Sequence, residues 1–137
     1  MLNNNLSVLY VEDDPMSREV LDIVLCRVMG VEKLWMFEDS INFMGRVVAL
    51  PERPNLILLD IHMRPHDGFQ MLEMLQDNPS YEDCKIVAVT ASVMNDEVAL
   101  LKKSGFDAII GKPIDVETFP GILLRVMQGE VVWNVAE

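Results

Sequence analysis

Short apolar runs alternate with longer stretches of helical period along the chain, and this alternation limits its fold more than any other feature. The apolar runs have the length of strands and predict strands near 6–11, 33–37, 55–59, 84–90 and 107–111. The stretches that follow them predict helices near 15–29, 39–49, 67–77, 95–104 and 118–128. Strands that alternate with helices in this way form parallel sheets joined by crossover helices. The sequence therefore predicts an α/β domain.

Two prolines and a glycine help to place the helix boundaries. Asp14 and Pro15 offer a helix cap followed by proline at the first helical position, where the missing N–H costs nothing. Gly30 is expected to end this helix. A start near Thr118 would put Pro120 in the tolerated first turn of the last helix. We therefore expect a short irregular passage at 114–117.

Length and composition indicate one packed domain. The chain has 137 residues, of which 50% are hydrophobic and 24% are charged, so a globular core is expected. We expect the domain to span 1–129, followed by a short tail at 130–137 and no output domain. The formal charge is −11, with 22 acidic residues against 11 lysines and arginines. This balance argues against nucleic-acid binding, which depends on basic side chains that displace counterions.

The amino-terminal end and the cysteines bear on the cellular location. The first residues lack the basic start and apolar core of a signal peptide. No apolar run approaches the roughly 18 residues that are needed to span a bilayer. Cys26 and Cys84 lie within apolar stretches and are expected to be buried free thiols. These features predict a cytoplasmic protein that makes no membrane contact.

Polar residues stand where four of the predicted strands end. Glu12 and Asp13 follow the first strand, Asp60 follows the third, and Thr90 and Lys112 follow the last two. The ends of parallel strands converge, so we expect these side chains to share one pocket. Like-charged carboxylates need a cation to hold them together. The set suits a divalent metal and a phosphoryl group, with Asp60 as the candidate to carry the phosphoryl group.

Four sequence motifs, in the order in which a known family has them, give the chain a resemblance to that family. The resemblance runs from about Leu6 to Gln128 and is to the CheY-like receiver domain of two-component response regulators. It implies a doubly wound (βα)5 flavodoxin-like fold, a three-layer sandwich with a five-stranded parallel sheet in the order 2-1-3-4-5. The motifs are Val-Glu-Asp-Asp-Pro at 11–15, Leu-Leu-Asp-Ile-His-Met at 58–63 with Asp67-Gly68 after it, Val-Thr-Ala at 89–91, and Gly-Lys-Pro at 111–113.

The resemblance also implies roles for individual residues. Asp60 matches the phosphoacceptor, and Thr90 matches the hydroxyl that hydrogen-bonds a phosphoryl oxygen. Lys112 matches the lysine that contacts both Asp60 and the phosphoryl group, and its bond to Pro113 is expected to be cis. The resemblance implies a phosphoprotein that catalyses its own phosphorylation and dephosphorylation. It does not imply turnover of an external substrate.

Mg²⁺ is the cofactor that the resemblance implies. Asp13 and Asp60 should ligate the metal, with Glu12 acting directly or through water and the His62 backbone carbonyl supplying another oxygen. Mg²⁺ favours hard oxygen ligands and retains several waters. Asp14 is better explained as the helix cap.

The implied partners are proteins of two-component signalling. A histidine kinase or a histidine phosphotransfer protein would donate the phosphoryl group. The family's usual partner and dimer surface would comprise the helix near 95–104, the strand near 107–111 and the helix near 118–128. Because this surface also serves for dimers, a homodimer is a further possible assembly. Trp133 could extend or cover the surface. Two alternatives also stay open: a receiver-like binding module that is independent of phosphorylation, and a receiver fragment of a hybrid histidine kinase.

Three residues depart from the family's usual pattern. Arg64 stands where proline is usual, with Pro65 one residue later, so the loop shape is expected to differ. Glu12 stands where aspartate is often found. Ile109 replaces the aromatic residue that is common three positions before the lysine. Because a branched aliphatic side chain cannot make the same rotamer change, we expect the switch to be muted or to run through the backbone of loop 91–96.

Overall fold

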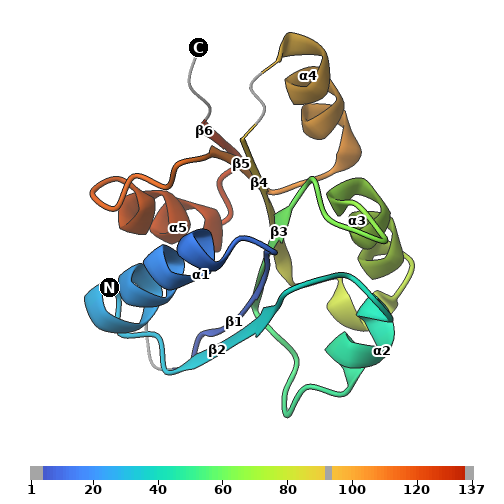
Figure 1. Cartoon of the computed structure of the whole chain (residues 1–137), viewed down its shortest axis with the longest axis horizontal. Coiled ribbons are helices and arrows are strands. Elements are labelled where there is room, and N and C mark those ends of the chain that lie inside the picture. The colour runs from blue at the N-terminus through green and yellow to red at the C-terminus, as the bar shows by residue number, and fades with distance from the viewer. Residues whose placement is uncertain (1–4, 92–93, 135–137) are drawn as a thin grey trace.

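The computed structural model of the chain describes residues 5–91 and 94–134 and shows a parallel sheet covered by helices on both faces (Figure 1). The strands are β1 (Ser7–Val11), β2 (Lys33–Phe37), β3 (Leu56–Asp60), β4 (Lys85–Thr90), β5 (Ala108–Gly111) and β6 (Val132–Asn134). The helices are α1 (Pro15–Asp22), α2 (Phe43–Val48), α3 (Gly68–Gln76), α4 (Asn95–Ser104) and α5 (Phe119–Met127). A π-helix, η1 (Ile23–Val28), continues α1, and a 3₁₀ helix, η2 (Pro79–Tyr81), follows α3.

The sheet order is β2-β1-β3-β4-β5-β6, and every neighbouring pair is parallel. This confirms the doubly wound fold and the order of the five expected strands. The expected strand count was one too low, because residues 132–134 of the tail fold back along β5. Gly129, with φ of +98°, lies where the chain turns back after α5. Val132 then pairs with Ala108, and Trp133 with Ile109.

Two hydrophobic cores lie on opposite faces of the sheet. Every residue of β1 and β3 is buried, as expected for central parallel strands that are covered on both sides. Alternate strand side chains enter opposite cores. In Figure 1, α1 and α5 lie on one side of the sheet, and α2 and α3 on the other. Helix residues of the first core are Leu21, Val24, Leu25, Phe119, Ile122, Leu123 and Val126. Those of the second are Phe43, Val47, Met71, Leu72, Leu75 and Leu101.

The predicted starts of α1 and α5 are confirmed by the structure. The Ser17 N–H donates to the Asp14 side chain at 3.1 Å, so Asp14 caps α1 as expected. Helix α5 begins at Phe119 and carries Pro120 in its first turn, after an irregular passage. These boundaries follow from local chemistry that the sequence displays directly.

Two helices differ from their predicted extents. The predicted helix near 15–29 changes from α to π geometry at Ile23, and the Met29 N–H donates to the Val24 carbonyl at 3.0 Å, five residues back. Gly30 follows it with φ of +75°, as the expected helix end. Helix α2 begins at Phe43 rather than near 39, because Asn42 is left-handed with φ of +48°. Apolar spacing does not reveal either change of backbone geometry.

The two cysteines are free, and they differ in burial. Cys84 is buried, but Cys26 is only half-buried, which corrects the expectation for that residue. Burial raises the pKa of Cys84 to about 12 and that of Cys26 to about 11. Neither thiol is therefore a reactive thiolate at neutral pH. No helix within residues 5–91 and 94–134 is long and apolar enough to cross a membrane.

Candidate functional site

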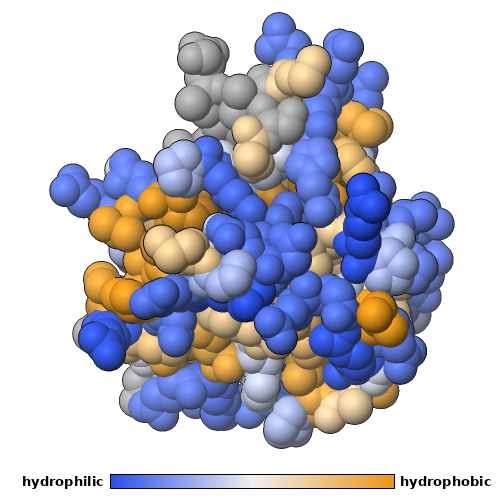
Figure 2. All heavy atoms as spheres, in the orientation of Figure 1, coloured by the Kyte–Doolittle hydropathy of each residue, from blue (hydrophilic) through white to orange (hydrophobic). Residues whose placement is uncertain are grey.

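The five predicted side chains lie at the carboxyl ends of four adjacent strands. Asp60 and Thr90 are the last residues of β3 and β4, and Lys112 directly follows β5. Glu12 and Asp13 directly follow β1. The loops after β1 and β3 meet near the middle of Figure 1, where hydrophilic side chains cover the same region of Figure 2. The structure thus brings together residues that lie up to 100 positions apart in the sequence, from Glu12 to Lys112.

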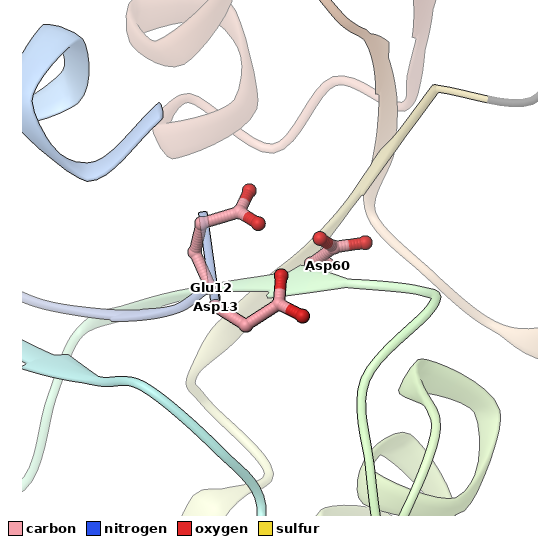
Figure 3. A group of neighbouring side chains, drawn as sticks. All are labelled: Glu12, Asp13 and Asp60. Carbon is pink, nitrogen blue, oxygen red and sulfur yellow. The ribbon is translucent and has the colours of Figure 1, made fainter. Parts of the chain in front are cut away.

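The acidic residues form a compact cluster whose carboxyl groups surround a common space (Figure 3). Glu12, Asp13 and Asp60 each offer an oxygen atom, and these atoms all lie within 4.8 Å of one another. Glu12 and Asp60 are buried, whereas Asp13 is exposed. Three carboxylates at this spacing repel one another unless a proton or a cation lies between them. The donor set of hard oxygens, with one side open to solvent, fits Mg²⁺.

Lys112 bridges the two buried carboxylates. Its Nζ donates to Asp60 Oδ2 at 2.9 Å and also forms an ion pair with Glu12 Oε1. Burial alone would lower the pKa of Lys112, but the hydrogen bonds to the two acids outweigh it and raise that pKa. The ammonium group is therefore charged at neutral pH. The peptide bond between Lys112 and Pro113 is cis, as expected.

The two buried acids have opposite pKa shifts. Burial raises the pKa of Glu12 to about 7, and hydrogen bonding with Asp60 adds to the rise, while Lys112 and Tyr10 oppose it. Burial also acts to raise the pKa of Asp60, but hydrogen bonds with Glu12, Lys112 and the His62 N–H lower it overall. The proton that this pair binds first therefore belongs to Glu12. The Asp60 carboxylate stays ionised.

Tyr10 supports Glu12, and the motifs did not identify it. The buried Tyr10 hydroxyl donates to Glu12 Oε1 at 2.7 Å. The available sequence signal was a tyrosine two residues before an acid, because alternate residues of a strand point to the same face. Burial and the charge of Glu12 together raise the pKa of Tyr10 far above its ordinary value, so it stays a donor.

Thr90 and His62 converge on a further acid, Glu97, which no motif contains. The Thr90 hydroxyl is buried and donates to Glu97 Oε1 at 3.2 Å. His62 Nε2 lies 3.2 Å from the same oxygen. The His62 backbone N–H donates to Asp60 Oδ1 at 3.0 Å. Glu97 is seven residues beyond Thr90 and on another element, so sequence spacing gives no signal for this contact.

The two remaining departures from the family pattern have distinct structural settings. The bond between Arg64 and Pro65 is a second cis peptide, in a loop that the buried Ser40 holds. Ser40 N–H donates to the Arg64 carbonyl at 3.1 Å, and its hydroxyl donates to the His66 carbonyl at 2.7 Å. Ile109 is fully buried in the core that also contains Leu101 of α4. The chain therefore has no aromatic side chain at position 109 that could move between the core and the surface.

Comparison with known proteins assigns this chain to a class of signalling module. A family model described as the response regulator receiver domain matches residues 8–123. The chain belongs to the response regulator receiver domain family. Receiver domains serve two-component signalling, interact with histidine kinases and downstream effectors, and do not turn over an external substrate.

Curated relatives include both kinases and regulators. The signal transduction histidine-protein kinase BarA of Escherichia coli is 27% identical over 90% of this chain and 13% of the kinase. The probable C4-dicarboxylate response regulator DctR of Halalkalibacterium halodurans is 33% identical over 88% of this chain and 50% of that protein. The chain thus spans a small part of the kinase and half of the regulator.

Solved structures confirm the fold. The chemotaxis response regulator CheY4 of Vibrio cholerae has a TM-score of 0.76 at 22% identity, covering 88% of this chain and 98% of that one. The receiver domain of the sensor histidine kinase PA1611 from Pseudomonas aeruginosa has a TM-score of 0.77 at 21% identity, covering 90% and 98%. That structure has a magnesium ion coordinated in its active site cleft.

Proposed function

We propose that Asp60 accepts a phosphoryl group from the phosphohistidine of a histidine kinase or a histidine phosphotransfer protein, and that phosphorylation changes the binding of a protein partner. The observation that carries this proposal is the setting of the Asp60 carboxylate. It accepts from Lys112 at 2.9 Å and shares a 4.8 Å cluster with Glu12 and Asp13. A buried nucleophile between an ammonium group and a cation site is suited to phosphoryl transfer.

The transfer exchanges one bond to phosphorus for another. An Asp60 oxygen attacks the phosphorus as the P–N bond of the phosphohistidine breaks, and the imidazole leaves with the bonding electrons. The lowered pKa of Asp60 keeps the nucleophile ionised. Lys112 already touches Asp60 Oδ2 and would neutralise charge on the transferring oxygens. Thr90 would then donate its hydroxyl hydrogen to a phosphoryl oxygen.

Mg²⁺ would be held by Asp13, Asp60 and the His62 carbonyl, with Glu12 acting directly or through water. When bound, it supplies positive charge to the phosphoryl oxygens. Glu12 Oε1 is already engaged by Tyr10 and Lys112, and Oε2 accepts from the Asp14 N–H at 3.3 Å, which together favour the action of Glu12 through water. Hydrolysis resets the site: water attacks the phosphorus and releases inorganic phosphate and the Asp60 carboxylate.

The proposal treats 1–129 as the receiver domain and 130–137 as its tail. The α4-β5-α5 face would bind the downstream protein or a second copy of the chain. The formal charge of −11 supports a protein partner rather than a nucleic acid. β6 pairs along the outer edge of β5, so Trp133 lies beside Ile109 and would form part of this face.

A titration with Mg²⁺ and beryllium trifluoride, a phosphoryl analogue, tests the switch. We expect NMR resonances of Thr90 and Lys112 to shift and the change to spread to α4, β5 and α5. Asp60→Asn should show none of these changes with beryllium trifluoride. Absence of any shift in the wild-type protein would refute the proposal.

One observation favours a second function, a receiver-like binding module independent of phosphorylation. Ile109 is aliphatic and fully buried, so the usual aromatic reporter is missing. This function predicts shifts confined to the pocket and equal partner affinity with and without beryllium trifluoride. The similarity to part of BarA leaves open that the chain works as the receiver of a hybrid kinase. That setting would change the phosphodonor but not the role of Asp60.

A further inference from the structure

Glu97 joins helix α4 to the end of β4 and to the β3-α3 loop, on either side of the phosphorylation site. It lies in the first turn of α4, and its side chain is 22% exposed. One oxygen, Oε1, accepts a hydrogen bond from Thr90 at the end of β4 and lies 3.2 Å from the His62 ring in the β3-α3 loop. A single carboxylate oxygen therefore touches both elements.

We propose that Glu97 is a positioning residue that holds the Thr90 hydroxyl in the unphosphorylated protein and competes with the phosphoryl group for it. The inference rests on the proposed phosphorylation of Asp60. A threonine hydroxyl has one hydrogen, so it cannot donate fully to Glu97 and to a phosphoryl oxygen together. The phosphoryl group also adds negative charge near the Glu97 carboxylate. Each phosphorylation would therefore break this hydrogen bond between α4 and β4.

The other neighbour of Glu97 also reaches the phosphoacceptor. The His62 ring lies beside Glu97, while its backbone N–H donates to Asp60 Oδ1 at 3.0 Å. A change at Asp60 therefore reaches Glu97 through the β3-α3 loop as well as through Thr90. The His62 route consists of contacts that are already present, whereas the Thr90 route would form when a phosphoryl oxygen accepts from the Thr90 hydroxyl.

The surroundings of Glu97 leave space for its side chain to move. A cavity of about 280 Å³ lies between the β3-α3 loop and α4, and Glu97, His62, Arg64 and Phe69 are among its lining residues. Ile109, in contrast, is closely packed in the core and offers no such movement. Glu97 thus gives α4 a connection to the pocket that does not require an aromatic residue on β5.

Two substitutions at Glu97 and one beside it test this role. In ligand-free protein, Glu97→Ala should move the Thr90 methyl and amide resonances towards their positions in the wild-type protein with beryllium trifluoride. The affinity for beryllium trifluoride, with Mg²⁺ at saturation, should rise about tenfold. Glu97→Gln keeps an acceptor oxygen without the charge, so its affinity should lie between those of the wild type and Glu97→Ala.

Asp96→Ala is the matched control. Asp96 is exposed in the same helical turn, so this variant removes the same charge from the same end of α4. It should retain the Thr90 resonances and the affinity of the wild type. Glu97→Ala behaving like Asp96→Ala in either measurement would overturn the role of Glu97. Failure of the wild-type protein to bind beryllium trifluoride would instead overturn the proposed function, since the ligand-free Thr90 shift is measured separately.

Discussion

Lys112 contacts both buried acids of the site, yet the acids differ in protonation. The pKa of Glu12 is raised to about 7, whereas that of Asp60 is lowered. The backbone N–H of His62 also donates to Asp60 Oδ1, which stabilises the ionised form of Asp60. The repulsion between the crowded carboxylates therefore disfavours the ionised form of Glu12 rather than that of Asp60. This division keeps Asp60 ionised and makes Glu12 responsive to pH and to a cation.

The raised pKa of Glu12 predicts a pH-dependent loss of stability in metal-free buffer. The ordinary value for glutamate is 4.5 and the folded value is about 7, so the folded state binds more protons between them. The contribution of Glu12 to the free energy of unfolding should be most favourable below about pH 4.5 and should fall as pH rises to about 7. Glu12→Gln removes this penalty and should be about 1–3 kcal/mol more stable than the wild type near pH 8.

Urea denaturation without divalent cations, at about pH 5 and about pH 8, measures this difference. Glu19→Gln, which neutralises an exposed acid on α1, should change stability by less than about 0.5 kcal/mol. A Glu12→Gln protein that is less stable than the wild type near pH 8 would contradict the assigned protonation.

Sequence reasoning placed the strand-end residues of the site but not their supporting contacts. Asp60, Thr90 and Lys112 could be placed together because the ends of parallel strands share one edge of the sheet. The contacts of Tyr10 and Glu97 depend on side-chain rotamers and on how α4 sits against the strand ends. Neither the side-chain rotamers nor the position of α4 is determined by the spacing of residues along the chain.

At the scale of the elements, β6 is the main addition to the predicted fold. Val132 is 6% exposed and packs into the core beneath α5, whereas Val131 is 58% exposed. A strand of three residues is too short to display a periodic pattern, so the sequence showed only an apolar tail. The π-helix after α1 was missed for a related reason, since six residues hold less than two turns.

The packing of β6 predicts different costs for two adjacent valines. Val132→Ala should lower the free energy of unfolding by about 1–2 kcal/mol, because it removes buried methyl groups. Val131→Ala should change it by less than about 0.5 kcal/mol. Thermal or urea denaturation of the two variants makes the comparison. Equal stabilities would show that the tail does not pack on β5 in solution.

At the scale of the whole molecule, the sheet brings distant sequence segments to one reactive edge. The alternation of strands and helices predicted a parallel sheet, and composition predicted a single packed domain. The strand order did not follow from that alternation, which is compatible with several windings, and came from the family resemblance. The order β2-β1-β3-β4-β5 places β3 between β1 and β4, and so sets Asp60 between the acidic pair and Thr90.

Phosphorylation by a small phosphodonor tests the central claim most directly. The wild-type protein, Asp60→Asn and Asp67→Asn would each be incubated with acetyl phosphate, with Mg²⁺ or with a chelator, and examined by intact mass and peptide mapping. Asp67→Asn is a suitable control because asparagine can still cap α3. We predict one phosphoryl group on the Asp60 peptide of the wild type and of Asp67→Asn, only with Mg²⁺, and none on Asp60→Asn. Equal labelling of Asp60→Asn, or labelling of the wild type at another residue, would contradict the account.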